Sequence, residues 1–128
     1  MKTINLLGST GSIGVQTLDV ARRQGYKIAA LAAYSDYKKL EEQIREFKPT
    51  FAALVDENAA KELKTRVADV PVKILSGSEG VSFCAAEAEG DTVLNAVVGM
   101  AGLKPTLEAI KAKKTKILKV RKAFLHII

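Results

Sequence analysis

Apolar and polar positions alternate along the chain in blocks, each short apolar run being followed by a segment with helical spacing. Runs such as Tyr26–Ala33 are almost continuously apolar, which is typical of strands buried on both faces of a sheet. The intervening segments place apolar residues on one helix face, for example Leu40, Ile44 and Phe47. The pattern predicts parallel strands joined by helices with right-handed crossovers, a single α/β domain with a doubly wound, Rossmann-like sheet.

Turn and capping signals give the expected boundaries. Lys48-Pro49 ends one helix, Ser78 is a candidate N-cap, and Pro105 suits the first turn of a last helix. We expect strands at Thr3–Leu7, Tyr26–Ala33, Phe51–Val55, Val72–Leu75 and Thr92–Val98. We expect helices at Ile13–Arg23, Tyr37–Phe47, Glu57–Val67, Ser78–Ala88 and Pro105–Lys111.

Length and composition limit the classes of protein that fit this pattern. The 128 residues, 48% of them apolar, suit one domain with its own core. No apolar run approaches the roughly 20 residues of a membrane span, and no signal peptide precedes the first strand, so we expect a cytoplasmic protein with no membrane partner. One cysteine, Cys84, and one histidine, His126, form no disulfide and no metal-ligand cluster. We interpret Cys84 as a core residue.

The net charge of +6 is concentrated at one end of the chain. Residues 111–128 hold seven basic residues and no acidic ones, which leaves residues 1–110 with a net charge of −1. This nearly neutral domain does not favour nucleic acid as a partner. We expect the domain to occupy residues 1–118. Residues 119–128 form an atypical basic and apolar tail, either the remnant of a strand with a disordered end or a segment that binds anionic partners.

A glycine-rich segment, Gly-Ser-Thr-Gly-Ser-Ile-Gly at residues 8–14, joins the first strand to the first helix. In doubly wound sheets, ligands bind at the carboxyl ends of the strands, next to the first strand. Gly8 suits a tight turn, Gly11 lets the backbone approach a phosphate, and Gly14 lets the helix pack closely on the sheet. This placement favours a nucleotide-binding loop over a purely structural turn.

Backbone N–H groups around Thr10, Ser12 and Ile13 lie at the positive end of the predicted helix and are expected to receive a pyrophosphate. The hydroxyls of Thr10 and Ser12 supply further hydrogen bonds. No Lys-Ser or Lys-Thr pair follows the glycines, so a nucleoside-triphosphate loop is not favoured. The expected ligand is a dinucleotide.

The group that contacts the adenosine ribose is expected about 20 residues past the glycines, at the end of the second strand. Tyr34-Ser35-Asp36 occupies this position, followed by Lys38 and Lys39. A carboxylate at Asp36 suits hydrogen bonds to ribose hydroxyls and would repel a 2′-phosphate, whereas Ser35 and the two lysines favour that phosphate. Asp36 alternatively serves only as the N-cap of the next helix.

Three segments together give a family resemblance. The glycine loop followed by Gln-Thr-Leu-Asp-Val at residues 16–20, Glu-Glu-Gln-Ile-Arg-Glu-Phe-Lys-Pro at residues 41–49, and Ala-Val-Val-Gly-Met-Ala-Gly-Leu-Lys-Pro-Thr at residues 96–106 resemble the N-terminal domain of 1-deoxy-D-xylulose 5-phosphate reductoisomerases. The resemblance covers about residues 1–115. It implies an NADPH-dependent oxidoreductase of the non-mevalonate isoprenoid pathway, which is homodimeric at full length. With a divalent metal, such an enzyme rearranges its substrate and reduces it to 2-C-methyl-D-erythritol 4-phosphate.

Carried over to this chain, the resemblance assigns the phosphate contacts to Thr10, Gly11, Ser12 and Ile13 and brings residues 99–102 near the nicotinamide. The family usually has Gly-Ser/Lys-Asn where this chain has Tyr34-Ser35-Asp36. Ser35 still matches, but the added ring and carboxylate leave the choice between NADPH and NADH open.

The C-terminal segment departs further from the family. A strand ending Leu-Ala-Asn-Lys-Glu is expected, but residues 117–128 read Ile-Leu-Lys-Val-Arg-Lys-Ala-Phe-Leu-His-Ile-Ile. No catalytic residue or metal ligand is therefore assigned, and we expect the chain to bind cofactor but to be catalytically incomplete alone. A non-catalytic nucleotide-binding or regulatory module with a basic interaction tail is the alternative.

Overall fold

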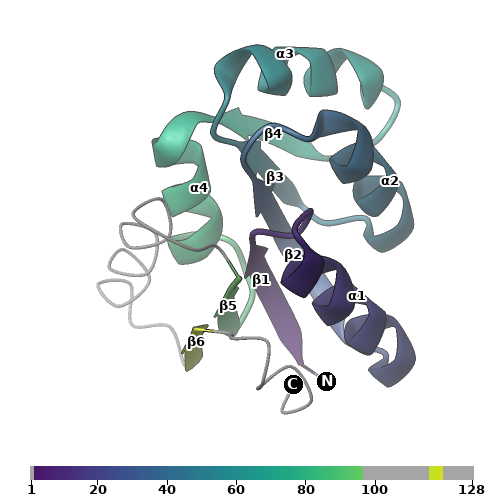
Figure 1. The fold of residues 1–128 in the computed structure, drawn as a ribbon, viewed down its shortest axis with the longest axis vertical. Helices are drawn as coiled ribbons and strands as arrows, with labels where there is room; N and C mark the ends of the chain where they lie inside the picture. Colours follow the sequence, from purple (N-terminus) through teal and green to yellow (C-terminus); the bar gives the residue numbers. More distant parts are fainter. Residues whose placement is uncertain (1, 97–115, 120–128) are drawn as a thin grey trace.

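The computed structural model describes residues 2–96 and the backbone of residues 116–119, and these form one twisted sheet covered by helices on both faces (Figure 1). The strands are β1 (Thr3–Leu7), β2 (Lys27–Ala33), β3 (Phe51–Leu54), β4 (Lys73–Ser76), β5 (Thr92–Asn95) and β6 (Lys116–Lys119). The helices are α1 (Ser12–Gln24), α2 (Tyr37–Phe47), α3 (Glu57–Arg66) and α4 (Gly77–Ala86).

All strand pairings are parallel, in the order β4-β3-β2-β1-β5-β6. The chain moves outward from β1 to β4 and then returns through α4 to β5 on the other side of β1. Helices α1, α2 and α3 lie on one face and α4 on the other (Figure 1). The doubly wound sheet predicted from the sequence is confirmed, and its switch point lies between β1 and β5.

Two apolar clusters fill the space between the sheet and its helices. On one face of β1, Ile4 and Leu6 pack in the cluster that contains Leu18 of α1 and Ile44 of α2. On the opposite face, Leu7 packs in the cluster of α4. Because consecutive strand residues point to opposite faces, a strand buried on both sides is expected to be mostly apolar. Strand β2 is a continuous apolar run after Lys27 for this reason, whereas β1 contains one buried polar residue, Asn5.

The expected boundaries coincide with the observed ones or differ by one or two residues, except at the end of β5. Helix α4 begins earlier than predicted, with Ser76 as its N-cap, so the assignment of this cap to Ser78 is wrong. Gly77 has a φ of 75°, and this left-handed residue turns the chain directly from β4 into α4, one residue before Ser78. Strand β5 ends at Asn95, whereas the prediction extended it to Val98. The helix predicted from Pro105 lies outside the described residues.

Candidate dinucleotide-binding site

The glycine loop leaves β1 through a tight turn. Gly8 has a φ of 84°, and the N–H groups of Gly8 and Ser9 both donate to the Ala32 carbonyl of β2, at 2.7 and 3.0 Å. Gly14 faces this turn from α1, and a Cβ at Gly14 would lie 2.0 Å from the Gly8 carbonyl oxygen. The predicted turn at Gly8 and the predicted close approach at Gly14 are therefore confirmed.

The first turn of α1 presents backbone N–H groups at the carboxyl edge of the sheet. Its N-cap, Gly11, has extended backbone and forms no side-chain capping hydrogen bond. The helical hydrogen bonds begin at the Val15 N–H, which donates to the Gly11 carbonyl at 2.9 Å. Among the described residues, the N–H groups of Ser12 and Ile13 have no acceptor. Since the helix dipole adds partial positive charge here, this end of α1 suits an anion.

The residues at the start of α1 differ in their exposure to solvent. Gly11 and Ser12 are exposed, whereas Thr10 and Ile13 are half-buried. Among the described residues, the nearest atom outside the adjoining residues to a Cβ at Gly11 would be the Gly8 carbonyl oxygen, at 3.8 Å. The glycine at this position is thus not required by packing among the described residues, in contrast to Gly14.

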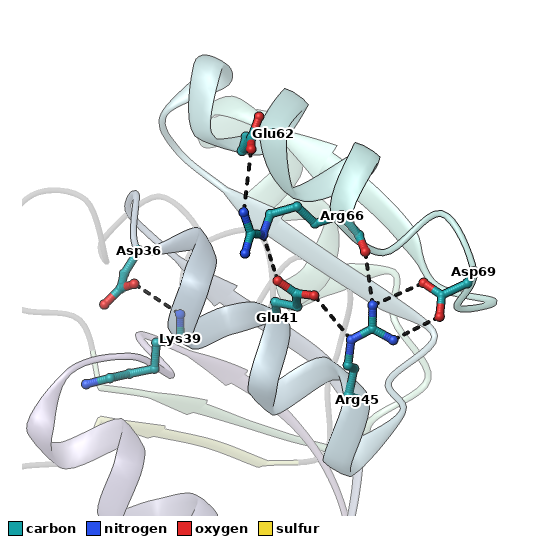
Figure 2. A network of polar contacts seen from close by, with 7 residues as sticks. All are labelled: Asp36, Lys39, Glu41, Arg45, Glu62, Arg66 and Asp69. Carbon is teal, nitrogen blue, oxygen red and sulfur yellow. Dashed lines mark hydrogen bonds and ion pairs between the residues drawn. The ribbon is translucent and has the colours of Figure 1, made fainter.

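Helix α2, which follows β2 in the chain, also contacts the glycine loop. The Gln43 amide Nε2 donates to the Ser9 carbonyl at 2.9 Å, and Lys39 Nζ donates to the Thr10 carbonyl at 3.4 Å. Figure 2 shows the Lys39 side chain extending away from α2. Sequence reasoning assigned no loop contact to Gln43. The available signal was its place beside Leu40 and Ile44, because a glutamine on the apolar face of a helix needs a polar partner.

Ser35 and Asp36 follow β2 at the same sheet edge as the loop, and both are exposed. The Asp36 carboxylate oxygen Oδ1 accepts a hydrogen bond from the Lys39 N–H at 3.1 Å (Figure 2). Asp36 is therefore the N-cap of α2, which was one of the two roles considered for it. The other carboxylate oxygen has no partner among the described residues. Tyr34 is 64% exposed beside them.

Few other groups in the described residues have reactive chemistry. Cys84 is fully buried in α4, as predicted, and burial raises the pKa of its thiol to about 12, so it is not a nucleophile. Within residues 2–96, no three His, Cys, Asp or Glu side chains are grouped to hold a metal. No helix in the described part of the chain could cross a membrane. The predicted nicotinamide contact at residues 99–102 and all of the predicted tail after residue 119 lie outside the described residues.

A family model for 1-deoxy-D-xylulose 5-phosphate reductoisomerase matches residues 4–123, nearly the whole chain. The chain belongs to this family. The match extends beyond the residues 1–115 expected from the sequence motifs. It includes the glycine loop, α2 and β6.

Curated relatives and solved structures agree with the family model. The reductoisomerase of Agathobacter rectalis is 49% identical over 90% of this chain, and that of Lachnoclostridium phytofermentans is 52% identical over 86%. A Zymomonas mobilis reductoisomerase structure in complex with NADPH matches with a TM-score of 0.84 and 34% identity over 91% of this chain and 31% of that one. The chain spans about 30% of the length of the curated relatives it matches. These findings favour the reductoisomerase assignment over the regulatory module.

Proposed function

We propose that residues 8–14 bind the pyrophosphate of NADPH, and that the chain is the cofactor-binding part of a 1-deoxy-D-xylulose 5-phosphate reductoisomerase. The observation that carries this proposal is the uncapped first turn of α1 beside Gly11. The NADPH complex of the similar Zymomonas mobilis enzyme supports the choice of ligand. Bound NADPH supplies a hydride for reducing the rearranged substrate to 2-C-methyl-D-erythritol 4-phosphate.

The loop fits a pyrophosphate in shape and in charge. The N–H groups of Ser12 and Ile13 have no acceptor among the described residues, and Gly11 lets an oxygen approach the backbone. Thr10 and Ser12 add hydroxyl donors. Gly8 and Gly14 shape the turn that holds these groups in place.

At the adenosine end, we propose that Ser35 and Lys39 favour NADPH over NADH. Capping of α2 engages one oxygen of the Asp36 carboxylate, which reduces its availability to ribose hydroxyls. The Lys39 ammonium lies 3.4 Å from the Thr10 carbonyl, between this segment and the loop. A cation at this position attracts a 2′-phosphate.

The family's divalent metal and substrate are proposed to use residues outside those described. A metal that holds a sugar phosphate needs several oxygen ligands around one ion, and residues 2–96 group no such set. We propose that residues 2–96 bind and orient the cofactor. We also propose that the protein acts in the cytoplasm.

The test is calorimetric titration of the full chain with NADPH and NADH. We expect saturable binding of NADPH and weaker binding of NADH. Gly11→Ala is expected to keep the melting temperature, because the added Cβ would contact no described residue outside its chain neighbours closer than 3.8 Å. It should nevertheless weaken NADPH binding by about tenfold or more, equivalent to at least 1.4 kcal/mol.

Gln24→Ala, an exposed change at the opposite end of α1, is the matched control and should bind NADPH normally. Absence of heat with either cofactor at millimolar concentration would refute the proposal. Equal NADPH affinities of the wild type and Gly11→Ala would show that the pyrophosphate does not bind at this loop.

A further inference from the structure

Gln43 is a buried amide on the apolar face of α2. Its side chain lies between Leu40 and Ile44 in sequence, and both of these are fully buried. Gln43 is 8% exposed, and its Oε1 has no hydrogen-bond partner among the described residues. Burying a polar group without full hydrogen bonding is unfavourable, so packing alone does not explain a glutamine at this position.

The one hydrogen bond of the Gln43 side chain among the described residues goes to the glycine loop. Nε2 donates to the Ser9 carbonyl at 2.9 Å, across 34 positions of sequence. Ser9 is itself fully buried, and its own N–H donates to the Ala32 carbonyl of β2 at 3.0 Å. Ser9 is therefore held by β2 through its N–H and by α2 through its carbonyl.

This arrangement fixes the orientation of the next peptide group. The described residues contain no cis peptide bond, and in a trans peptide the carbonyl and the following N–H point in opposite directions. When Gln43 holds the Ser9 carbonyl toward α2, the Thr10 N–H must point away from α2. That N–H has no acceptor among the described residues.

We infer that Gln43 is a positioning residue of the dinucleotide site, which orients the Ser9–Thr10 peptide so that the Thr10 N–H is presented to the pyrophosphate. The inference rests on the proposed function, since it assumes that the loop binds a pyrophosphate. Gln43 acts through Ser9 and does not touch the cofactor. A donor that is already oriented binds without the entropic cost of ordering the loop.

The experiment compares two ligands on the full chain. NADPH carries the pyrophosphate, whereas adenosine 2′-monophosphate keeps the adenosine end and lacks it. Gln43→Met keeps the length of the side chain and removes the amide. We expect it to weaken NADPH binding by about tenfold, the effect of one hydrogen bond of about 1.4 kcal/mol, while adenosine 2′-monophosphate binding changes less than twofold.

Ile44→Val is the matched control, because it loosens the same face of α2 without changing a polar contact. It should lower the melting temperature and leave both affinities within twofold. If Gln43→Met does not fold, Gln43→Leu replaces it. Leucine also fits an apolar helix face and cannot donate to the Ser9 carbonyl, so the same selective loss of NADPH binding is expected.

The outcomes separate the two proposals. If the wild-type chain does not bind NADPH, the proposed function fails, and the role of Gln43 fails with it. If the wild type binds NADPH and the Gln43 variant binds it equally well, only the positioning role is overturned. A parallel loss of affinity for both ligands, or the same loss in Ile44→Val, also overturns it, because the effect would then be general destabilisation.

Discussion

Asn5 is a polar residue in the middle of the central strand, and it is fully buried. Its amide donates to the carbonyls of Ala85 and Ala88, at 3.4 and 3.3 Å, and its Oδ1 accepts from the Gly90 N–H at 3.0 Å. A Cβ at Gly90 would lie 2.3 Å from that oxygen. Asn5 therefore anchors the end of α4 and the turn into β5, so that β5 starts in register beside β1.

We predict that Asn5→Leu lowers the free energy of unfolding by about 2 kcal/mol, because it removes the buried acceptor of the Gly90 N–H and a donor to two carbonyls. Urea denaturation followed by circular dichroism measures this change. Asn58→Leu, on the exposed surface of α3, is the control and should alter stability by less than about 0.5 kcal/mol. Equal midpoints for wild type and Asn5→Leu would contradict the anchoring role.

At the scale of elements, α2 and α3 are joined by a network of ion pairs on their exposed surfaces (Figure 2). Glu41 of α2 accepts from Arg66 of α3 at 2.8 Å and from Arg45 at 3.2 Å. Arg45 in turn contacts both oxygens of Asp69, at 3.0 and 3.1 Å. Because α2 also contacts the glycine loop, this network links α3 to the candidate site. Exposed pairs are individually weak, so the linkage depends on the whole network.

The ion pairs of Glu41 make the stability of the fold depend on pH. The hydrogen bond from Arg66, and then that from Arg45, lower the pKa of Glu41 below its ordinary value of 4.5. A carboxylate with a lowered pKa in the folded state stabilises the fold above the pKa of the unfolded chain, and this contribution is lost as the pH falls through the folded value. Arg66→Met should therefore reduce the melting temperature at pH 7, and the difference from wild type should narrow toward pH 3.

Melting curves between pH 3 and pH 7 test this expectation. Lys61→Met is the control, since Lys61 is an exposed cation on the same helix whose side chain has no ion pair among the described residues. If the difference in melting temperature between Arg66→Met and the wild type stays constant across this range, ionisation of Glu41 does not contribute to stability through its pair with Arg66.

At the scale of the whole molecule, the sixth strand completes one side of the sheet. The β6 backbone pairs in parallel with β5 from Thr92 to Asn95. Val93 and Leu94 in β5 are fully buried. Residues 116–118 of β6 belong to the expected domain, and Lys119, the first residue of the expected tail, is the last residue of this strand.

We predict that a chain ending at residue 119 keeps the melting temperature of the full chain to within about 2 °C, whereas a chain ending at residue 115 melts at least about 5 °C lower. The shorter chain loses the parallel ladder on β5. A loss of 1 kcal/mol shifts the midpoint by roughly 4–8 °C in domains of about 60–100 residues and by roughly 2–4 °C in domains of about 150–250 residues, so the expected shift corresponds to a loss of about 1–2 kcal/mol. Differential scanning calorimetry of both chains measures the shifts. Equal melting temperatures would mean that β6 adds no stability.

The sequence by itself determined the order and type of the elements from β1 to β5 and the place of the glycine loop, whereas β6 was not among the predicted strands. Continuous apolar runs identify buried strands, helical spacing identifies the helices between them, and Gly8 and Gly14 mark a strand-to-helix junction. These are local properties of the chain, because each depends on residues a few positions apart. The motifs at residues 8–20 and 41–49 also indicated the family, which the family model then showed.

Only the tertiary structure decided which residues from distant segments meet. Gln43 contacts Ser9 across 34 positions, and Asn5 contacts Gly90 across 85. No local pattern specifies either pair. Gln43 meets Ser9 only when α2 packs beside the loop that follows β1, and Asn5 meets Gly90 only when β5 pairs with β1. The structure also showed that Asp36 caps α2. Capping depends on backbone geometry at the helix start, which the identity of the residue allows but does not fix.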